Sequence, residues 1–442
     1  MISDRDRLAR SDSHAAALSC LEAGISAADP ERVITTSVTR DGDVLMIDGD
    51  RYDLAAYDRV ILVGGGKAGG PIARALEDIL GDWLDGGIVV TDAPTETDHV
   101  EVIVGDHPIP SQQSVVGGES VLQTVEEADE HTLVIATVSG GGSALLAAPA
   151  DGLTIEDLRS VTETLIESGA SIDEINAVRK HCSALKGGRL ARAAAPATVA
   201  SLTLSDVIGD DLETIASGPL APDSSTYEDA QAVLERYEID PPEAIREHLA
   251  AGVANERSET PDSSDPAFET VVNYVLANAR TALEAAADAA REHEYEAHVL
   301  SSRIRGEARE AALMHMAVAE EMAATGDPFT PPAILLSGGE TTVSVRGDGI
   351  GGPNHEFALA AALELDRDGI VVAAVDTDGR DGTANAAGAI IDNATVDDQS
   401  AGLAALANND AGQYLADRAA TLETGGTGTN VNDLRVVVVD TD

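Results

Sequence analysis

Short apolar, β-branched runs recur along the chain, and most of them end in glycine or small polar residues. The clearest are 59–63, 132–138 and 198–204 in the first half, and 333–336 and 369–375 in the second. Between them lie stretches with apolar residues at helical spacing. Continuous apolar runs are typical of strands buried on both faces, so the alternation predicts doubly wound α/β domains.

The pattern divides into two predicted domains. Residues 1–255 are expected to form a Rossmann-like, three-layer N-terminal domain that begins with an amphipathic helix over 4–29. The polar stretch 256–266, ERSETPDSSDP, is expected to be an exposed linker. Residues 267–442 are expected to form a second α/β domain. Because ligands in open α/β sheets bind beyond the carboxyl ends of strands, we expect an active-site cleft between the two domains.

The most informative motif follows the strand at 59–63. There Gly64, Gly65 and Gly66 are followed at once by Lys67, and a helical pattern begins at the glycines. A helix N-terminus presents backbone N–H groups to an anion, and a lysine beside it suits phosphate. The sequence therefore predicts a phosphate site at these glycines, with Lys67 beside the phosphate.

Lysine is rare in this chain, which adds weight to that interpretation. Only three of the 28 basic residues are lysine: Lys67, Lys180 and Lys186. All three lie in or beside glycine-rich or helix-start segments. We interpret Lys67 and Lys186 as functional, and a functional and a structural role are equally open for Lys180.

Other strand ends carry polar or glycine-rich loops. The loop after 132–138 does not match the nucleophile elbow G-x-S-x-G, because Leu145 stands where the second glycine belongs. A phosphate or carboxylate cradle is the better interpretation. The residues expected to bind phosphate or nucleotide in these later loops are Ser139, Gly140, Gly141, Gly142, Ser143, Gly338, Gly339 and Glu340.

Carboxylates and one histidine complete the candidate site. Asp206 and Asp378 each follow an apolar strand in a loop with serine or glycine, and His107 lies in a rigid loop before Pro108. Phosphoryl transfer needs carboxylates that hold Mg²⁺ or orient the attacking hydroxyl. Asp206 and Asp378 are the predicted metal ligands and catalytic acids, and ligand contact and loop structure are equally open for His107.

The amino-acid composition limits which classes of molecule the protein can bind. A net charge of −50 in 442 residues argues against nucleic acid or an anionic membrane as a partner, since both would be repelled. The two cysteines, Cys20 and Cys182, form no disulfide framework or zinc motif, and the N-terminus shows no signal peptide. We expect a soluble cytoplasmic protein with small-molecule substrates, and a homodimer is left open.

Two other function classes compete with phosphoryl transfer. Residues 64–69 formally match G-x-G-x-x-G, and Asp92 ends the next strand, as in dinucleotide-binding proteins. An NAD(P)H-dependent reductase is therefore an alternative, although pyrophosphate needs no lysine in the turn. The second alternative is a protein that binds a nucleotide or sugar phosphate without catalysis.

Taken together, the segments resemble the class II glycerate 2-kinase family, whose C-terminal half is the MOFRL domain. The matching stretches include VGGGKAGG, GDHPIPSQQS, VSGGGSALLAAP, INAVRKHCSALKGGRLA, LTLSDVIGDDLETIASGP, LLSGGETTV, DTDGRDGTANAAGA and TGGTGTNVNDL. The resemblance implies transfer of the γ-phosphoryl of ATP to the 2-hydroxyl of D-glycerate, with a divalent metal such as Mg²⁺. It implies an essential role for Lys67, and older members were labelled hydroxypyruvate reductases.

The resemblance also implies substrate contacts by His107, Lys186, Arg189 and Asn354. One departure stands out: the family commonly has GGRNQE where this chain has GGPNHE, so Pro353 replaces an arginine implicated in activity. Another arginine could fill that role, and the candidates are Arg305, Arg346 and Arg380.

The acidic composition generates a prediction about salt. Abundant Asp and Glu with few lysines are typical of adaptation to molar salt, where the Debye length falls to about 3 Å and self-repulsion is screened. We expect far-ultraviolet circular dichroism to show loss of structure when the protein is moved from molar KCl to dilute buffer. Full activity without salt would contradict this.

Overall fold

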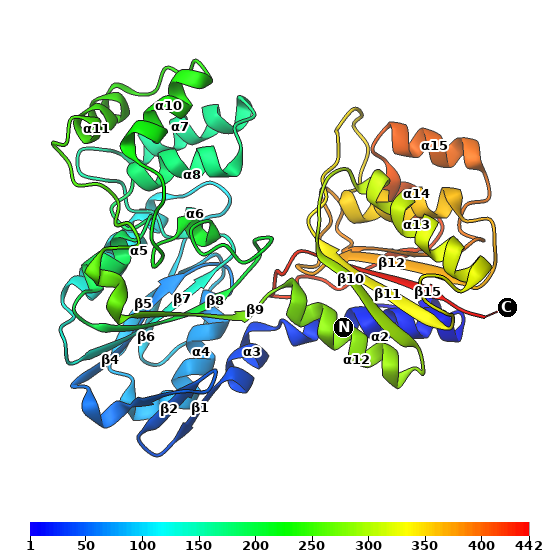
Figure 1. Cartoon of the computed structure of the whole chain (residues 1–442), viewed down its shortest axis with the longest axis horizontal. Helices are drawn as coiled ribbons and strands as arrows, with labels where there is room; N and C mark the ends of the chain where they lie inside the picture. The colour runs from blue at the N-terminus through cyan, green and yellow to red at the C-terminus, as the bar shows by residue number, and fades with distance from the viewer. Residues whose placement is uncertain (442) are drawn as a thin grey trace. The chain divides into compact units, whose positions relative to one another are not determined.

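The computed structural model describes residues 1–441 and divides into two compact units (Figure 1). The first unit comprises residues 33–276. The second unit combines residues 1–32 with the chain from Ala277 onward. Residue 442, the last of the predicted second domain, lies outside the described residues.

The first unit is built on a six-stranded sheet in the order β6-β5-β4-β7-β8-β9. Strands β4 to β8 pair in parallel, so their carboxyl ends share one edge. A small antiparallel sheet, β1-β2-β3, precedes it. The strands are β1 (Val38–Asp41), β2 (Val44–Ile47), β3 (Asp50–Asp53), β4 (Arg59–Gly65), β5 (Gly86–Thr91), β6 (Val100–Val104), β7 (Thr132–Ser139), β8 (Thr198–Leu204) and β9 (Val271–Ala277).

Helices cover both faces of this sheet, which gives the three-layer arrangement that the sequence predicts. Helix α4 packs on β4 and β5, while α5 and α9 share a core with Ile61, Val63 and Val90 on the other face. Helices α7, α8, α10 and α11 form a separate helical cluster (Figure 1). The helices are α3 (Pro30–Ser37), α4 (Gly69–Leu80), α5 (Gln112–Glu126), α6 (Gly142–Leu145), α7 (Ile155–Glu167), α8 (Ile172–His181), α9 (Arg189–Ala194), α10 (Tyr227–Arg236) and α11 (Glu243–Val253).

The second unit holds another six-stranded sheet, in the order β10-β11-β15-β12-β13-β14. The last strand, β15, lies antiparallel between β11 and β12, so those two strands point the same way. The strands are β10 (Glu296–Ile304), β11 (Ala333–Gly339), β12 (Ile370–Asp376), β13 (Gly388–Ile391), β14 (Thr421–Leu422) and β15 (Asp433–Val439).

Alternate residues of β15 face two different cores. Val436 and Val438 pack with α2 and α12, whereas Val437 and Val439 pack with α13 and α14. The second unit is therefore also three-layered. Its helices are α1 (Arg5–Leu8), α2 (Asp12–Ala27), α12 (Ala279–Glu292), α13 (Ala308–Thr325), α14 (Pro353–Glu364), α15 (Gln399–Ala407) and α16 (Ala411–Ala416).

These units differ from the predicted division of the chain. The helix predicted over 4–29 is broken into α1 and α2, and it packs in the second unit because Leu18, Leu21 and Ile25 are buried against α12 and β15. Strand β9, assigned from sequence to the second domain, is the edge strand of the first sheet.

The segment 256–266 is largely exposed, as predicted, but it is not a linker between the units, because it is anchored within the first unit. Thr260 is 4 % exposed, and Asp265 forms an ion pair with Arg192 at 2.7 Å. The carbonyl of Pro261 accepts a hydrogen bond from the Asp223 N–H at 2.9 Å. The polar composition of this segment reflects side chains that bond back to the first unit.

The placement of α2 can be tested by a core substitution. We expect Leu21→Ala to destabilise the second unit by about 2–5 kcal/mol, because it opens a cavity between α2, α12 and the sheet. Hydrogen exchange measured by mass spectrometry should show lost protection in residues 277–441 and not in 33–276. The matched control is Leu403→Ala, at a side chain 57 % exposed. Lost protection confined to 33–276 would contradict the observed division.

Candidate active site

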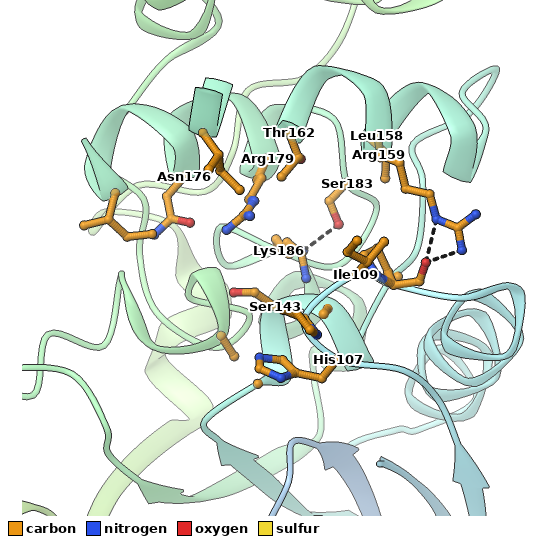
Figure 2. A pocket seen from close by; sticks show the side chains of 18 of the residues that line it. His107, Ile109, Ser143, Leu158, Arg159, Thr162, Asn176, Arg179, Ser183 and Lys186 are labelled. Carbon is orange, nitrogen blue, oxygen red and sulfur yellow. Dashed lines mark hydrogen bonds between the residues drawn. The ribbon is translucent and has the colours of Figure 1, made fainter. Parts of the chain in front are cut away.

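A cavity of about 590 Å³ lies in the first unit (Figure 2). Its floor comes from loops that follow the carboxyl ends of β6, β7 and β8, and its opposite wall comes from α7, α8 and the segment after α8. The position agrees with the general rule for ligand sites in open α/β sheets. Its polar lining includes His107, Gly140, Gly141, Ser143, Asn176, Arg179, Ser183, Lys186 and Asp206.

The turn after β4 brings Lys67 to this site, but not through an open cradle of N–H groups. The N–H groups of Gly66 and Lys67 donate to the carbonyls of Val90 and Gly140, at 3.0 and 2.9 Å. Those of Ala68 and Gly69 donate to Ser139 Oγ and the Gly66 carbonyl. The prediction that these N–H groups are unpaired and available to an anion is therefore wrong, because each already donates a hydrogen bond within the protein.

The glycines of that turn serve close packing. Gly64 has φ 123°, and a Cβ there would lie 2.1 Å from the Thr137 carbonyl oxygen on β7. At Gly66, with φ 135°, a Cβ would lie 2.1 Å from Ser139 Oγ. Neither position tolerates a side chain, so these glycines lock β4 to β7 and deliver Lys67 at a fixed place.

The glycine turn after β7, at Gly140 and Gly141, lies between the side chains of three predicted site residues, Lys67, His107 and Asp206. A Cβ at Gly140 would lie 2.2 Å from Asp206 Oδ2. A Cβ at Gly141, where φ is 78°, would lie 3.1 Å from both Lys67 Cγ and His107 Cδ2. The absence of side chains here lets Lys67, His107 and Asp206 gather around one backbone turn.

The Lys67 charge acts on the pKa values of two neighbouring side chains, His107 and Asp206. Burial and the Lys67 charge both lower the pKa of the His107 imidazole, which favours its neutral form. Burial raises the pKa of the Asp206 carboxyl, and the Lys67 charge opposes that rise. This part of the cavity thus holds an ammonium group beside a carboxyl group and a neutral imidazole.

Two further cations face the cavity without carboxylate partners. Lys186 is 5 % exposed, and its Nζ donates to the Leu146 carbonyl at 2.7 Å. Within residues 1–441 the Arg179 guanidinium makes no hydrogen bond or ion pair, and burial lowers its pKa. Burial, with a smaller contribution from Arg179, lowers the pKa of Lys186 to about 7.

A hydrogen-bonded chain supports the polar side of the cavity. Ser143 Oγ and Ser217 Oγ are 2.8 Å apart, and the Ser217 hydroxyl donates to Asn176 Oδ1 at 3.1 Å. Ala216 and Ser217 have φ of 51° and 61°, which is strained for residues with a side chain. Backbone strain held beside a cavity in this way is typical of a functional site.

The other basic residues of this region have structural partners. Lys180 Nζ forms a buried ion pair with Asp223 at 2.9 Å, which resolves its open role in favour of structure. Arg189, predicted to contact substrate, does not line the cavity. Its guanidinium donates to the Lys180 carbonyl at 2.7 Å and to the Tyr227 hydroxyl at 3.2 Å.

The remaining predicted residues lie in the second unit, near the ends of β11 and β12. Gly339 has φ 133°, and a Cβ there would lie 2.2 Å from the Ile304 carbonyl oxygen, so packing requires this glycine. Gly338 lies beside Asp433, where a Cβ would be 3.2 Å from the Asp433 carbonyl oxygen. Glu340 is exposed, and its N–H donates to the Ile304 carbonyl.

Asn354 and Asp378 also have internal partners. Asn354 is fully buried, and its amide donates to Asp433 at 2.6 Å and to Asp381 at 3.2 Å. The Asp378 carboxylate accepts the Arg380 N–H at 2.8 Å. Burial and the Asp378 carboxylate raise the pKa of neighbouring Asp376 to about 8. These contacts favour a positioning role for Asn354.

Carboxylates that could help to hold a divalent metal are present singly or in pairs. Over residues 1–441, no three His, Cys, Asp or Glu side chains converge in an arrangement that would hold a metal ion. Mg²⁺ in phosphoryl transfer usually takes one or two carboxylates and completes its shell with water and phosphate oxygens. Asp206 in the first unit and Asp378 in the second are each a carboxylate of this kind, and their role as metal ligands stays a prediction.

Sequence reasoning missed Arg179 and Asn176 as site residues. Both lie on α8 within the quoted stretch INAVRKHC, three residues apart, and therefore on one helix face. The helix predicted over 171–192 is interrupted, because α8 ends at His181 and Ser183 and Lys186 lie in the non-helical segment before α9. None of the helices described over residues 1–441 is long and apolar enough to cross a membrane.

An α/β protein with unpaired cations around a cavity at strand carboxyl ends belongs to the class that binds phosphate-bearing or carboxylate ligands. Residues 16–250 match the family model described as "Domain of unknown function (DUF4147)", and residues 333–433 match that of the MOFRL family. The chain belongs to the class II, MOFRL-type glycerate 2-kinase family, which confirms the resemblance seen in the sequence.

Relatives and a solved structure agree over nearly the whole length. A glycerate 2-kinase from Pyrococcus horikoshii is 38% identical, covering 94% of each chain. The crystal structure of glycerate kinase from Thermotoga maritima superposes with a TM-score of 0.85 at 36% identity, covering 96% of this chain and 98% of that one. A protein from Agrobacterium vitis, provisionally named a hydroxypyruvate reductase, is 40% identical over 86% of this chain and 87% of its own.

The buried Lys186 generates a prediction about pH. Its pKa is about 7 in the folded protein and about 10.4 in an unfolded chain, so between these values the unfolded state holds the extra proton. The free energy of unfolding should therefore rise with pH above about 7, by up to about 1.4 kcal/mol per pH unit from this group. Urea denaturation from about pH 7 to about pH 9 should show that slope diminished in Lys186→Met.

The same slope should persist when KCl is varied in the molar range, because desolvation is not screened by salt. An unchanged slope in Lys186→Met would mean that other groups produce it.

Proposed function

We propose that this protein is a glycerate 2-kinase that transfers the γ-phosphoryl group of ATP to the 2-hydroxyl of D-glycerate. The cation-rich cavity at the carboxyl ends of β6, β7 and β8 carries the proposal. In a chain with 78 acidic residues, enclosed cations without acidic partners indicate a ligand that brings its own negative charge. The names of the relatives supply the substrate.

Lys67 is the proposed electrostatic catalyst. Its side chain lies against Gly141, close to His107 and Asp206, and the backbone bonds of its turn fix where it begins. An ammonium group held in this way stabilises charge on the transferring phosphoryl oxygens without reorganisation during the reaction. Since the amides of the Gly64–Gly66 turn are already bonded, the lysine side chain performs this task.

Asp206 and His107 are proposed to act on the acceptor side. The Asp206 carboxylate lies beside Gly140, where it would orient the 2-hydroxyl group or help to hold a Mg²⁺ ion. His107, with its lowered pKa, stays neutral and offers a ring nitrogen to a substrate oxygen. A bound Mg²⁺ ion would supply neutralisation of phosphate charge, and in the second unit Asp378 is the carboxylate proposed as a metal ligand.

The activity itself is tested on the unmodified protein. Incubation with D-glycerate, Mg-ATP and molar KCl should give 2-phosphoglycerate, identified by phosphorus NMR. A 3-phosphate product would correct the regiochemistry. Absence of any phosphorylated product, together with NADH-dependent loss of hydroxypyruvate, would replace the kinase with the reductase alternative.

Removal of the Lys67 ammonium group should abolish most turnover. We expect Lys67→Met to lower kcat by about 100-fold or more, the size found for loss of one preorganised charge-stabilising donor. Circular dichroism in molar KCl should be unchanged, because the backbone bonds of the turn do not involve the side chain. The control is Arg51→Met, an exposed cation on β3. Wild-type turnover in Lys67→Met would remove the centre of this mechanism.

A further inference from the structure

The cavity has two kinds of wall. Its polar side carries Arg179, Lys186 and the Gly140–Gly141 turn, whereas its other side is largely apolar. Helix α7 supplies Leu158, Val161, Thr162 and Ile166 at helical spacing, and Arg159, Glu163 and Glu167 of the same helix also line the cavity. The loop after β6 and the end of α6 add further apolar groups opposite: Pro108, Ile109, Pro110, Ala147 and Ala148.

The apolar wall is preformed. The Arg159 guanidinium on α7 donates twice to the Pro110 carbonyl, once at 2.7 Å through Nε, and so ties the helix to the loop after β6 (Figure 2). The Ile109 and Ile166 side chains are nevertheless 51 % and 57 % exposed. A fixed wall that leaves large apolar side chains in water is typical of a site whose ligand covers them.

Size excludes the acceptor as the only occupant. A cavity of about 590 Å³ lies within the range of roughly 300–1,000 Å³ found for ligands of drug size. Glycerate, a fully oxygenated three-carbon acid, fills a small part of that space. It also offers no apolar surface to Leu158, Val161 or Ile166, so it would gain nothing from α7.

The cations at the cavity indicate a ligand that carries more than one anionic group. Arg179 has no partner within the described chain, and the only acceptor for Lys186 Nζ is a backbone carbonyl. Arg179 and Lys186 line the polar side of the cavity, and Lys67 lies directly behind it, against the lining residue Gly141. A series of cations along one wall suits a polyphosphate rather than a single carboxylate.

We infer that this cavity of the first unit is the nucleoside triphosphate site, with the base and ribose against α7 and the loop 108–110 and the polyphosphate along Arg179 and Lys186 toward Lys67. This assignment rests on the proposed kinase function, since it concerns the phosphoryl donor. It places the donor, rather than the small acid, on the apolar wall.

Photolabelling locates the base without requiring turnover. Irradiation of the wild-type protein with 8-azido-ATP in molar KCl, followed by proteolysis and mass spectrometry, should label peptides that contain residues 107–110 or 155–167. Excess ATP should suppress the label, and D-glycerate alone should not. Label in peptides from 277–441, or label that glycerate alone removes, would overturn the assignment. Because no chemistry is needed, this result is independent of whether glycerate is phosphorylated.

A cavity-filling substitution then separates the two substrates. Thr162 points into the cavity from α7 (Figure 2), and we expect Thr162→Trp to raise the KM for ATP by at least about tenfold while the KM for D-glycerate stays within about twofold. The matched control is Val116→Trp on α5, at an exposed position outside the cavity lining. An increase confined to the KM for glycerate would overturn the inference and leave the kinase function standing.

Discussion

The site depends on close approach at two glycines, Gly140 and Gly141. Any Cβ at Gly140 would overlap the Asp206 carboxylate, and one at Gly141 would press on Lys67 and His107. Three loops that follow different strands thus meet around a backbone without side chains. The neighbouring turn of β4 and β7 obeys the same constraint at Gly64 and Gly66, where the steric partners are backbone and Ser139. At Gly64 and Gly66, glycine is a packing requirement that places a lysine, whereas the turn at Gly140 and Gly141 stays a predicted phosphate cradle.

The pairing of charges around the cavity indicates what kind of ligand it binds. In a chain of net charge −50, almost any cation can find a carboxylate, and Lys180 does so with Asp223. Lys186, six residues later, is equally buried but bonds only a carbonyl, and its pKa is about 7 because burial disfavours its charge. Arg179 is likewise unpaired. Burial of unpaired cations costs stability, so their enclosure is best explained by an anionic ligand that offsets the cost on binding.

The sequence predicted what local pattern can encode. Strand β8 was predicted with its observed bounds, and β4, β7 and β12 to within two residues, because buried strands that end in glycine or aspartate leave a local signature. The position of α2 left no such signature, since its partner α12 begins more than 250 residues later. The sequence also could not show that the N–H groups after β4 are hydrogen-bonded, because their acceptors come from β5 and from the turn after β7. Arg179 and Lys180 are adjacent in sequence, and only the fold shows that Lys180 has a carboxylate partner whereas Arg179 has none within the described residues.

The replacement of the family arginine by Pro353 fits this picture. Proline is well suited to the first turn of a helix, and Pro353 begins α14, so the backbone there is kept while a cation is lost. The three arginines that could compensate, Arg305, Arg346 and Arg380, are all exposed, and Arg380 already donates to Asn385. Exposed cations are strongly screened in molar salt, whereas the buried Lys186 and the half-buried Arg179 line a cavity where screening is weaker. In so acidic a chain, the cations best suited to hold phosphate under the proposed function are those that solvent screens least, and Lys186 and Arg179 of the first unit are of this kind.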